Sequence, residues 1–160
     1  MVCIAKVLVV VEDQNKNYIL MSSKRAPRHP QKNMKLELLG GHLETDERAL
    51  DALVRELAEE ESTGFLAKYA KAANPAPFKV DVAGTTHFLF RLTIQKDEFD
   101  RLIADAEESF GFKLVPYKHL FEDAIQNRLT KRTRAILKAF KRIDAFQPII
   151  QSSVQVTPTD

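Results

Sequence analysis

The fold of this chain follows from two short runs of sequence, Leu38-Leu39-Gly40-Gly41-His42-Leu43-Glu44 and Arg55-Glu56-Leu57-Ala58-Glu59-Glu60. Two glycines directly after apolar residues are typical of the end of a strand. From Thr45 onward, leucines recur at three- and four-residue intervals, which predicts a helix that ends near Ser62-Thr63-Gly64. The segment therefore predicts a strand, a loop and an amphipathic helix.

Three carboxylates of this helix share one face. At about 100° per residue, Glu60 lies about 40° from Glu56 in projection, and Glu59 lies about 60° to the other side. Neither Glu56 nor Glu60 has a basic residue three or four positions away, although like charges one turn apart destabilise a helix. A solvated surface that pairs Asp51, Arg55 and Glu59 accounts for only one of the three carboxylates. Clustered oxygen ligands on a rigid element suit Mg²⁺ or Mn²⁺.

The spacing of these residues closely resembles the signature of the Nudix hydrolases. In that family, Gly, Glu, Arg-Glu, an apolar residue and Glu-Glu recur at fixed separations before a further Gly and an apolar residue. The matching positions here are Gly41, Glu47, Arg55-Glu56-Leu57, Glu59-Glu60 and Gly64-Phe65. The chain departs from the pattern at Leu39, where Pro often stands, and by two extra residues before Gly64.

The resemblance implies an α/β (α+β) fold in which a mixed β-sheet is sandwiched between helices. The apolar periodicity of the rest of the chain agrees with it, and Asp46 and Glu47 are expected in the first turn of the central helix. We expect one domain, residues 1–146, and a C-terminal tail, residues 147–160. Strands are predicted at Cys3–Val11, Tyr18–Met21, Leu36–Leu39, Thr85–Ile94 and Lys113–Tyr117, a short helix within Asp97–Glu108, and a terminal helix at Leu129–Phe146.

The composition points to a soluble cytoplasmic protein. The longest apolar run, Val7 to Val11, is far shorter than the roughly 20 residues that span a bilayer, and the first residues lack a secretory signal. The single cysteine, Cys3, excludes an internal disulfide. Among 160 residues, 24 Lys and Arg against 22 Asp and Glu give a net charge of +2, so we do not expect a nucleic-acid partner.

The resemblance implies metal-dependent hydrolysis of a nucleoside diphosphate linked to another moiety. Glu56 and Glu60 would be the main ligands of Mg²⁺, with Mn²⁺ as a possible substitute, and Glu59 a further ligand. The carbonyl of Gly40 or Gly41 would add another oxygen, because glycine allows the backbone to approach an ion closely.

Other positions of the motif are expected to hold the site in shape. Gly40, Glu47 and Gly64 belong to this group, and Arg55 would brace the loop and the helix through Glu47 or a backbone carbonyl.

The resemblance leaves the general base open, because family members draw it from within the motif or from a later loop. The candidate catalytic carboxylates are Glu56, Glu59, Glu107 and Glu108.

Three further residues are candidates for contact with a nucleotide-derived substrate, namely Arg25, Arg28 and His87. An ADP-ribose-like compound or a nucleotide sugar is the favoured substrate. The alternatives are a nucleoside triphosphate pyrophosphohydrolase that clears modified nucleotides and an RNA 5′-end pyrophosphohydrolase. A non-enzymatic alternative is nucleic-acid binding through the basic terminal helix (Lys131, Arg132, Arg134, Lys138, Lys141 and Arg142). The chain is expected to be a monomer or a homodimer.

Overall fold

The computed structural model describes residues 2–141, and strand β1 (Val2–Asp13) lies at its centre. β1 pairs in parallel with β6 (Thr85–Gln95) along one edge. On its other edge it pairs antiparallel with β4 (Leu39–His42) along its first half and with β2 (Lys16–Lys24) along its second half. Both long edges are paired and both faces are covered, so the run from Val7 to Val11 is almost fully buried.

Three further strands complete the seven-stranded mixed sheet. β5 (Phe78–Val82) extends it beyond β6, whereas β3 (Leu36–Glu37) and β7 (Ser109–Pro116) both pair with β2.

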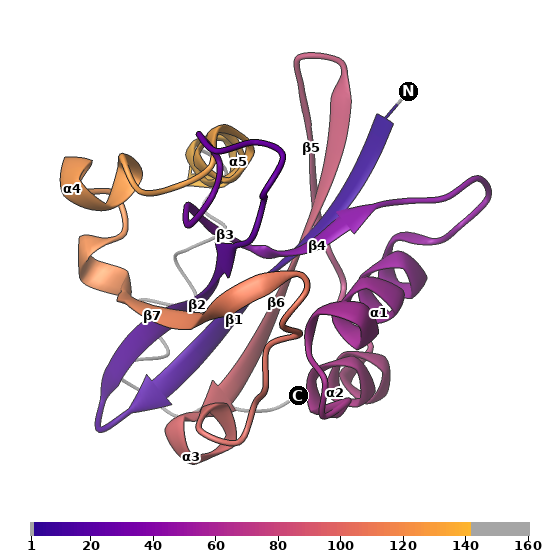
Figure 1. Ribbon diagram of the computed structural model, residues 1–160. Helices are drawn as coiled ribbons and strands as arrows, with labels where there is room; N and C mark the ends of the chain where they lie inside the picture. Colours follow the sequence, from indigo (N-terminus) through magenta and orange to yellow (C-terminus); the bar gives the residue numbers. More distant parts are fainter. Residues whose placement is uncertain (1, 142–160) are drawn as a thin grey trace.

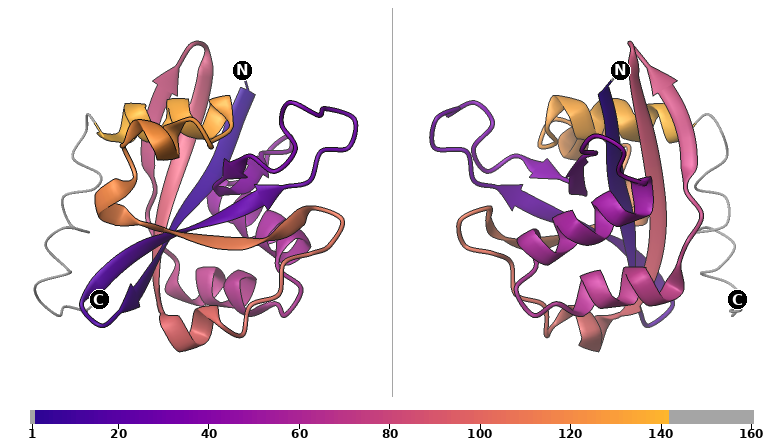
Figure 2. Two further views of the ribbon diagram at one scale, coloured as in Figure 1. Left: turned by 60° about the vertical axis from the view of Figure 1, so that its left-hand side comes forward. Right: turned by 90° about the vertical axis from the view of Figure 1, so that its right-hand side faces the viewer.

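Helices cover both faces of this sheet (Figure 1 and Figure 2). On one face lie α1 (Ala49–Glu60) and α2 (Phe65–Ala73), and α3 (Lys96–Phe99) follows β6. On the other face, the 3-10 helix η1 (Tyr117–His119) and α4 (Asp123–Gln126) lead to α5 (Lys131–Lys141). The predicted α+β sandwich is therefore confirmed. No helix within residues 2–141 is long and apolar enough to cross a membrane.

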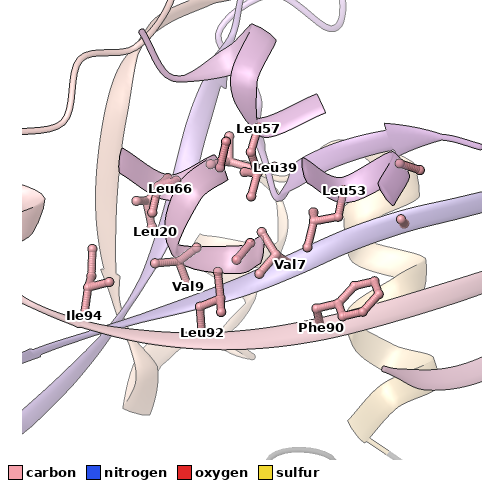
Figure 3. Packing of buried hydrophobic residues seen from close by; sticks show 14 of the residues in the cluster. Val7, Val9, Leu20, Leu39, Leu53, Leu57, Leu66, Phe90, Leu92 and Ile94 are labelled. Atoms are coloured by element: carbon pink, nitrogen blue, oxygen red, sulfur yellow. The ribbon is translucent and has the colours of Figure 1, made fainter. Parts of the chain in front are cut away.

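The two helical layers bury separate apolar clusters. Figure 3 shows Leu53 and Leu57 of α1 and Leu66 of α2 above Val7 and Phe90 of the sheet. On the opposite face, the alternate residues of β1 pack beneath α5, with Leu8, Val10, Ile136, Leu137 and Phe140 in one cluster. The alternation of side chains along a strand explains how one strand serves both cores.

The central helix is shorter than the sequence predicted. It begins at Ala49 and not at Thr45, because Asp46 adopts a left-handed conformation (φ +64°) and Glu47 bonds back to the Glu44 amide. The expected placement of Asp46 and Glu47 in its first turn is therefore wrong. The helix ends at Glu60 and not at a glycine terminus, since Glu61 is already extended.

Gly64 does not end a helix but precedes one. It adopts φ +80° at the N-terminal cap of α2, a helix that the sequence analysis missed. The edge strand β5 was missed as well, although Phe78, Val80 and Val82 alternate with more exposed polar residues, as in a half-buried strand.

The helix predicted within Asp97–Glu108 is confined to Lys96–Phe99. It does not continue because the amides of Ile103 and Asp105 donate to Glu61 Oε2 and the Glu60 carbonyl instead of to helical carbonyls. The predicted terminal helix is observed as α5; residues 142–146 and the 147–160 tail lie outside the described residues.

Candidate active site

The two glycines bring β4 into contact with the carboxylate face of α1. The Gly40 amide donates to Glu60 Oε1 at 2.9 Å. Gly40 has φ +127°, and a Cβ atom there would collide with the Ala5 carbonyl of β1. A Cβ at Gly41 would collide with the Glu56 carboxylate, so only glycine lets that carboxylate lie against the strand.

The environment of these carboxylates favours their protonated forms. Burial raises the pKa of Glu60 to about 8, against the opposing influences of Lys6 and the Gly40 amide. Burial also raises the pKa of Glu56, and the neighbouring charge of Glu59 adds to the shift. Glu59 itself is exposed over 54% of its side chain. Two partly desolvated carboxylates and an exposed one therefore share this face of α1.

Arg55 connects the loop after β4 to the helix. Its guanidinium donates to both carboxylate oxygens of Glu47 at 3.0 Å and to the His42 carbonyl at 2.9 Å. The same group lies 3.3 Å from Glu56 and 3.7 Å from Glu59. Its hydrogen bonds lower the pKa of Glu47. Arg55 is thus placed to hold the loop and to face the carboxylates at the same time.

A buried lysine that the sequence analysis overlooked lies behind the glycines. Lys6 is only 7% exposed, and its Nζ donates to the carbonyls of Leu38 and Gly40 at 3.1 and 3.2 Å. Its positive charge opposes the rise in pKa at both Glu56 and Glu60. The sequence pattern that could have revealed Lys6 is a lysine inside an otherwise apolar strand.

The loop that carries Glu107 and Glu108 lies beside the C-terminal end of α1 (Figure 1). The Asp105 amide donates to the Glu60 carbonyl at 2.9 Å, and Ala104 forms a β-bridge with Glu61. Glu107 and Glu108 are both exposed. The structure therefore brings this loop to the carboxylate helix, although Glu107 and Glu108 follow Glu60 by 47 and 48 residues in the sequence.

The three predicted substrate residues lie in different surroundings. Arg25 Nη1 donates to the Ala106 carbonyl at 2.6 Å, so this guanidinium is already engaged with the loop before β7. Arg28 is exposed in the basic loop. His87 is 6% exposed and shares with Leu89 the α5 face of the sheet, where burial, together with the charge of Arg132, lowers its pKa.

This geometry coincides with a family match. A NUDIX domain model matches residues 4–140. The chain belongs to the Nudix family. The resemblance carried by Gly41, Glu47 and Arg55-Glu56 is thereby confirmed. No curated protein sequence matches the chain significantly.

Solved Nudix structures share the fold at low sequence identity. A Francisella tularensis bifunctional NMN adenylyltransferase/ADP ribose pyrophosphatase, complexed with AMP and a manganese ion, is 21% identical with a TM-score of 0.64; the match covers 89% of this chain and 41% of that one. A C. elegans Ap4A hydrolase is 17% identical with a TM-score of 0.55, covering 89% and 98%. The Nudix hydrolase RenU from M. smegmatis is 13% identical with a TM-score of 0.60, covering 98% and 89%. This chain thus spans about two fifths of the Francisella protein.

The donor set of this Nudix chain suits a divalent cation. Among the residues that the structure describes, no three His, Cys, Asp or Glu side chains already converge as a metal cage. Glu60 is turned to the Gly40 amide and Glu56 to Arg55. Clustered carboxylate oxygens beside a glycine backbone are nevertheless the hard oxygen donors that Mg²⁺ or Mn²⁺ takes. A cation bound there would favour the deprotonated carboxylates, against the burial that raises the pKa of Glu56 and Glu60.

Proposed function

We propose that this chain hydrolyses the pyrophosphate of a nucleoside diphosphate linked to another moiety, either an ADP-ribose-like compound or a nucleotide sugar, with Mg²⁺ or Mn²⁺. The observation that carries the proposal is the placement of Glu56 and Glu60 against Gly41 and Gly40, with Glu59 beside them. The Francisella neighbour, which includes an ADP ribose pyrophosphatase, supports the substrate class.

Each group of residues has a proposed task. Glu56, Glu59 and Glu60 would hold the cation, which when bound neutralises pyrophosphate charge and makes water more acidic. The Gly41 carbonyl is a further candidate ligand. Gly40 has its amide on Glu60 and its carbonyl on Lys6, so it serves to join β4, α1 and β1.

Proton transfer and substrate binding would come from the surrounding loops. Glu107 or Glu108 would accept the proton of the attacking water, because their loop is attached at the end of α1. Arg28 would contact a substrate phosphate, with Arg25 supporting the loop and donating its remaining N–H groups.

Nucleic-acid binding without catalysis has less support. Lys141 Nζ lies over the Phe121 ring, 4.4 Å from its centroid, and Arg134 Nη1 donates to the Gln126 carbonyl at 3.2 Å. Part of the basic charge of α5 is therefore used in contacts within the chain.

A substrate panel tests the proposal. ADP-ribose, nucleotide sugars, dinucleoside polyphosphates, NTPs, dNTPs and 5′-triphosphate RNA would be incubated with Mg²⁺, Mn²⁺ or chelator, and the products resolved by chromatography. We expect metal-dependent release of a nucleoside monophosphate from ADP-ribose or a nucleotide sugar. Exclusive turnover of NTPs or of RNA 5′ ends would replace the proposal by the corresponding alternative. No turnover, together with steeply salt-dependent RNA binding, would favour a binding protein.

A further inference from the structure

Glu61, which lies next to the proposed metal ligands, is a buried carboxylate that the proposed chemistry does not use. It is 1% exposed, and it directly follows the last residue of α1. Its carboxylate accepts hydrogen bonds from the Thr63 amide at 2.9 Å, the Thr63 hydroxyl, the Leu66 amide at 3.4 Å and the Ile103 amide at 3.1 Å. A carboxylate satisfied in this way is strongly fixed in position.

These bonds join three parts of the chain. Thr63 lies in the two-residue insertion, Leu66 in the first turn of α2, and Ile103 at the start of the loop that carries Glu107 and Glu108. The backbone continues the connection, because the Ser62 amide donates to the Ile103 carbonyl at 2.8 Å and the Asp105 amide donates to the Glu60 carbonyl. Residues 60–62 and 103–105 are thus joined by an isolated antiparallel β-bridge between Glu61 and Ala104.

We propose that Glu61 is a positioning residue, whose carboxylate holds the 103–108 loop at the end of α1 and so sets where Glu107 and Glu108 stand relative to Glu59 and Glu60. This inference rests on the proposed function. Without the Glu61 carboxylate, the Ile103 amide loses its acceptor, and only the single β-bridge still holds the loop at the end of α1. The extra residues after Glu60 then have a purpose, since they let the chain turn so that Glu61 lies between α2 and the loop.

Two variants break the connection from opposite sides. Glu61→Ala removes the acceptor, whereas Ile103→Pro removes the loop's N–H, besides fixing φ at residue 103, and leaves Glu61 bonded to Thr63 and Leu66. Ile136→Ala, which would leave a cavity in the core between α5 and the sheet, is the control for lost stability. Each full-length variant is measured for melting temperature, for kcat and KM on the hydrolysed substrate, and for hydrogen exchange of the Asp105 amide.

We expect Glu61→Ala and Ile103→Pro to lower kcat by about tenfold or more relative to Ile136→Ala, because small misplacements of reacting groups are costly. KM should change by less than about threefold, and the Asp105 amide should exchange faster only in the two loop variants. Glu61→Gln, which keeps one acceptor oxygen for Ile103, should restore part of both the protection and kcat.

Two results would overturn the inference. One is a kcat equal to that of the control although the Asp105 amide exchanges rapidly; the other is unchanged protection of Asp105 in both loop variants. If Glu61→Ala does not fold, Ile103→Pro and Glu61→Gln decide. If the wild type hydrolyses nothing in the panel, the proposed function fails, and Asp105 exchange alone decides whether Glu61 positions the loop.

Discussion

Single side chains in this molecule carry several contacts at once, and Arg55 is the clearest case. It binds Glu47 through two hydrogen bonds, the His42 carbonyl through a third, and lies within 4 Å of Glu56 and Glu59. A planar guanidinium with five donors can do this, whereas a lysine cannot.

Arg55→Ala should therefore reduce both stability and turnover. We expect a loss of about 1–3 kcal/mol in the free energy of unfolding, because Glu47 and the His42 carbonyl lose their partner, and a fall in kcat as the loop shifts. Urea unfolding and turnover assays measure the two effects. Arg48→Ala is the matched control, since Arg48 forms only an exposed ion pair with Asp51. A purely kinetic defect at unchanged stability would contradict the bracing role.

Glu60→Gln should lower turnover without lowering stability. We expect turnover to fall by about 100-fold or more through loss of a ligand. The melting temperature near neutral pH should not fall, because burial already disfavours the charged carboxylate. The exposed Asp51→Asn on the same helix is the control. Unchanged activity would show that Glu60 is not a ligand.

His87 should make stability depend on pH. Its pKa is lowered in the folded state by burial and by Arg132, so the unfolded chain binds the proton more readily. The contribution of neutral His87 to the free energy of unfolding is fully present above the ordinary histidine pKa of about 6.5. It is lost as the pH falls from there through the lowered pKa of the folded state. The free energy of unfolding of the wild type and of His87→Leu would be measured from pH 8 to pH 5, about the range in which histidine titrates. As the pH falls, the wild type should lose stability relative to His87→Leu. A difference independent of pH would refute this.

At the scale of elements, the site depends on how closely β4 and α1 approach each other. The two glycines of β4 leave the Glu56 and Glu60 carboxylates directly against the strand backbone. β4 is in turn held by its pairing with β1 and by the Lys6 ammonium, which donates to the Gly40 carbonyl. The position of the carboxylates thus depends on backbone contacts more than on the helix alone.

Gly41→Ala tests this approach. The added methyl group would occupy the place of the Glu56 carboxylate, so we expect kcat or metal affinity to fall by about 10- to 100-fold. Turnover as a function of Mg²⁺ concentration separates the two effects. Activity equal to that of the wild type would mean that Glu56 is free to move without consequence.

At the scale of the whole molecule, one sheet serves two apolar cores. Leu57 of α1 and Leu137 of α5 are both fully buried, but on opposite faces, and β1 contributes to both clusters. A perturbation of either core therefore acts on the same central strand.

Leu57→Ala and Leu137→Ala should each destabilise the protein by about 2–5 kcal/mol. Because the cores share β1, we expect each variant to unfold in a single transition, with coincident changes in far-ultraviolet circular dichroism and tyrosine fluorescence. Separate transitions would show that the two faces unfold independently.

Local patterns explain most of what could be predicted. The buried face of the central helix, the long strands on either side of the sheet's centre and the carboxylate motif all follow from residues close together in sequence, where periodicity reports burial. Three predicted boundaries failed, at Thr45, at Gly64 and within Asp97–Glu108. Near Thr45 the side chain of Glu47 takes the Glu44 amide, and within Asp97–Glu108 the side chain of Glu61, from a distant segment, takes the Ile103 amide.

The sequence by itself determined the family, the mixed α+β fold and the grouping of Glu56, Glu59 and Glu60 on one face of a helix. These features depend on residue type and on spacing along one short segment. Only the tertiary structure decided that Lys6 lies behind the glycines and that Glu61 joins the 103–108 loop to α1. These contacts connect residues 32 and 42 positions apart in the chain. The physical reason is that hydrogen bonds between distant segments arise from sheet pairing and helix packing, which no local pattern records.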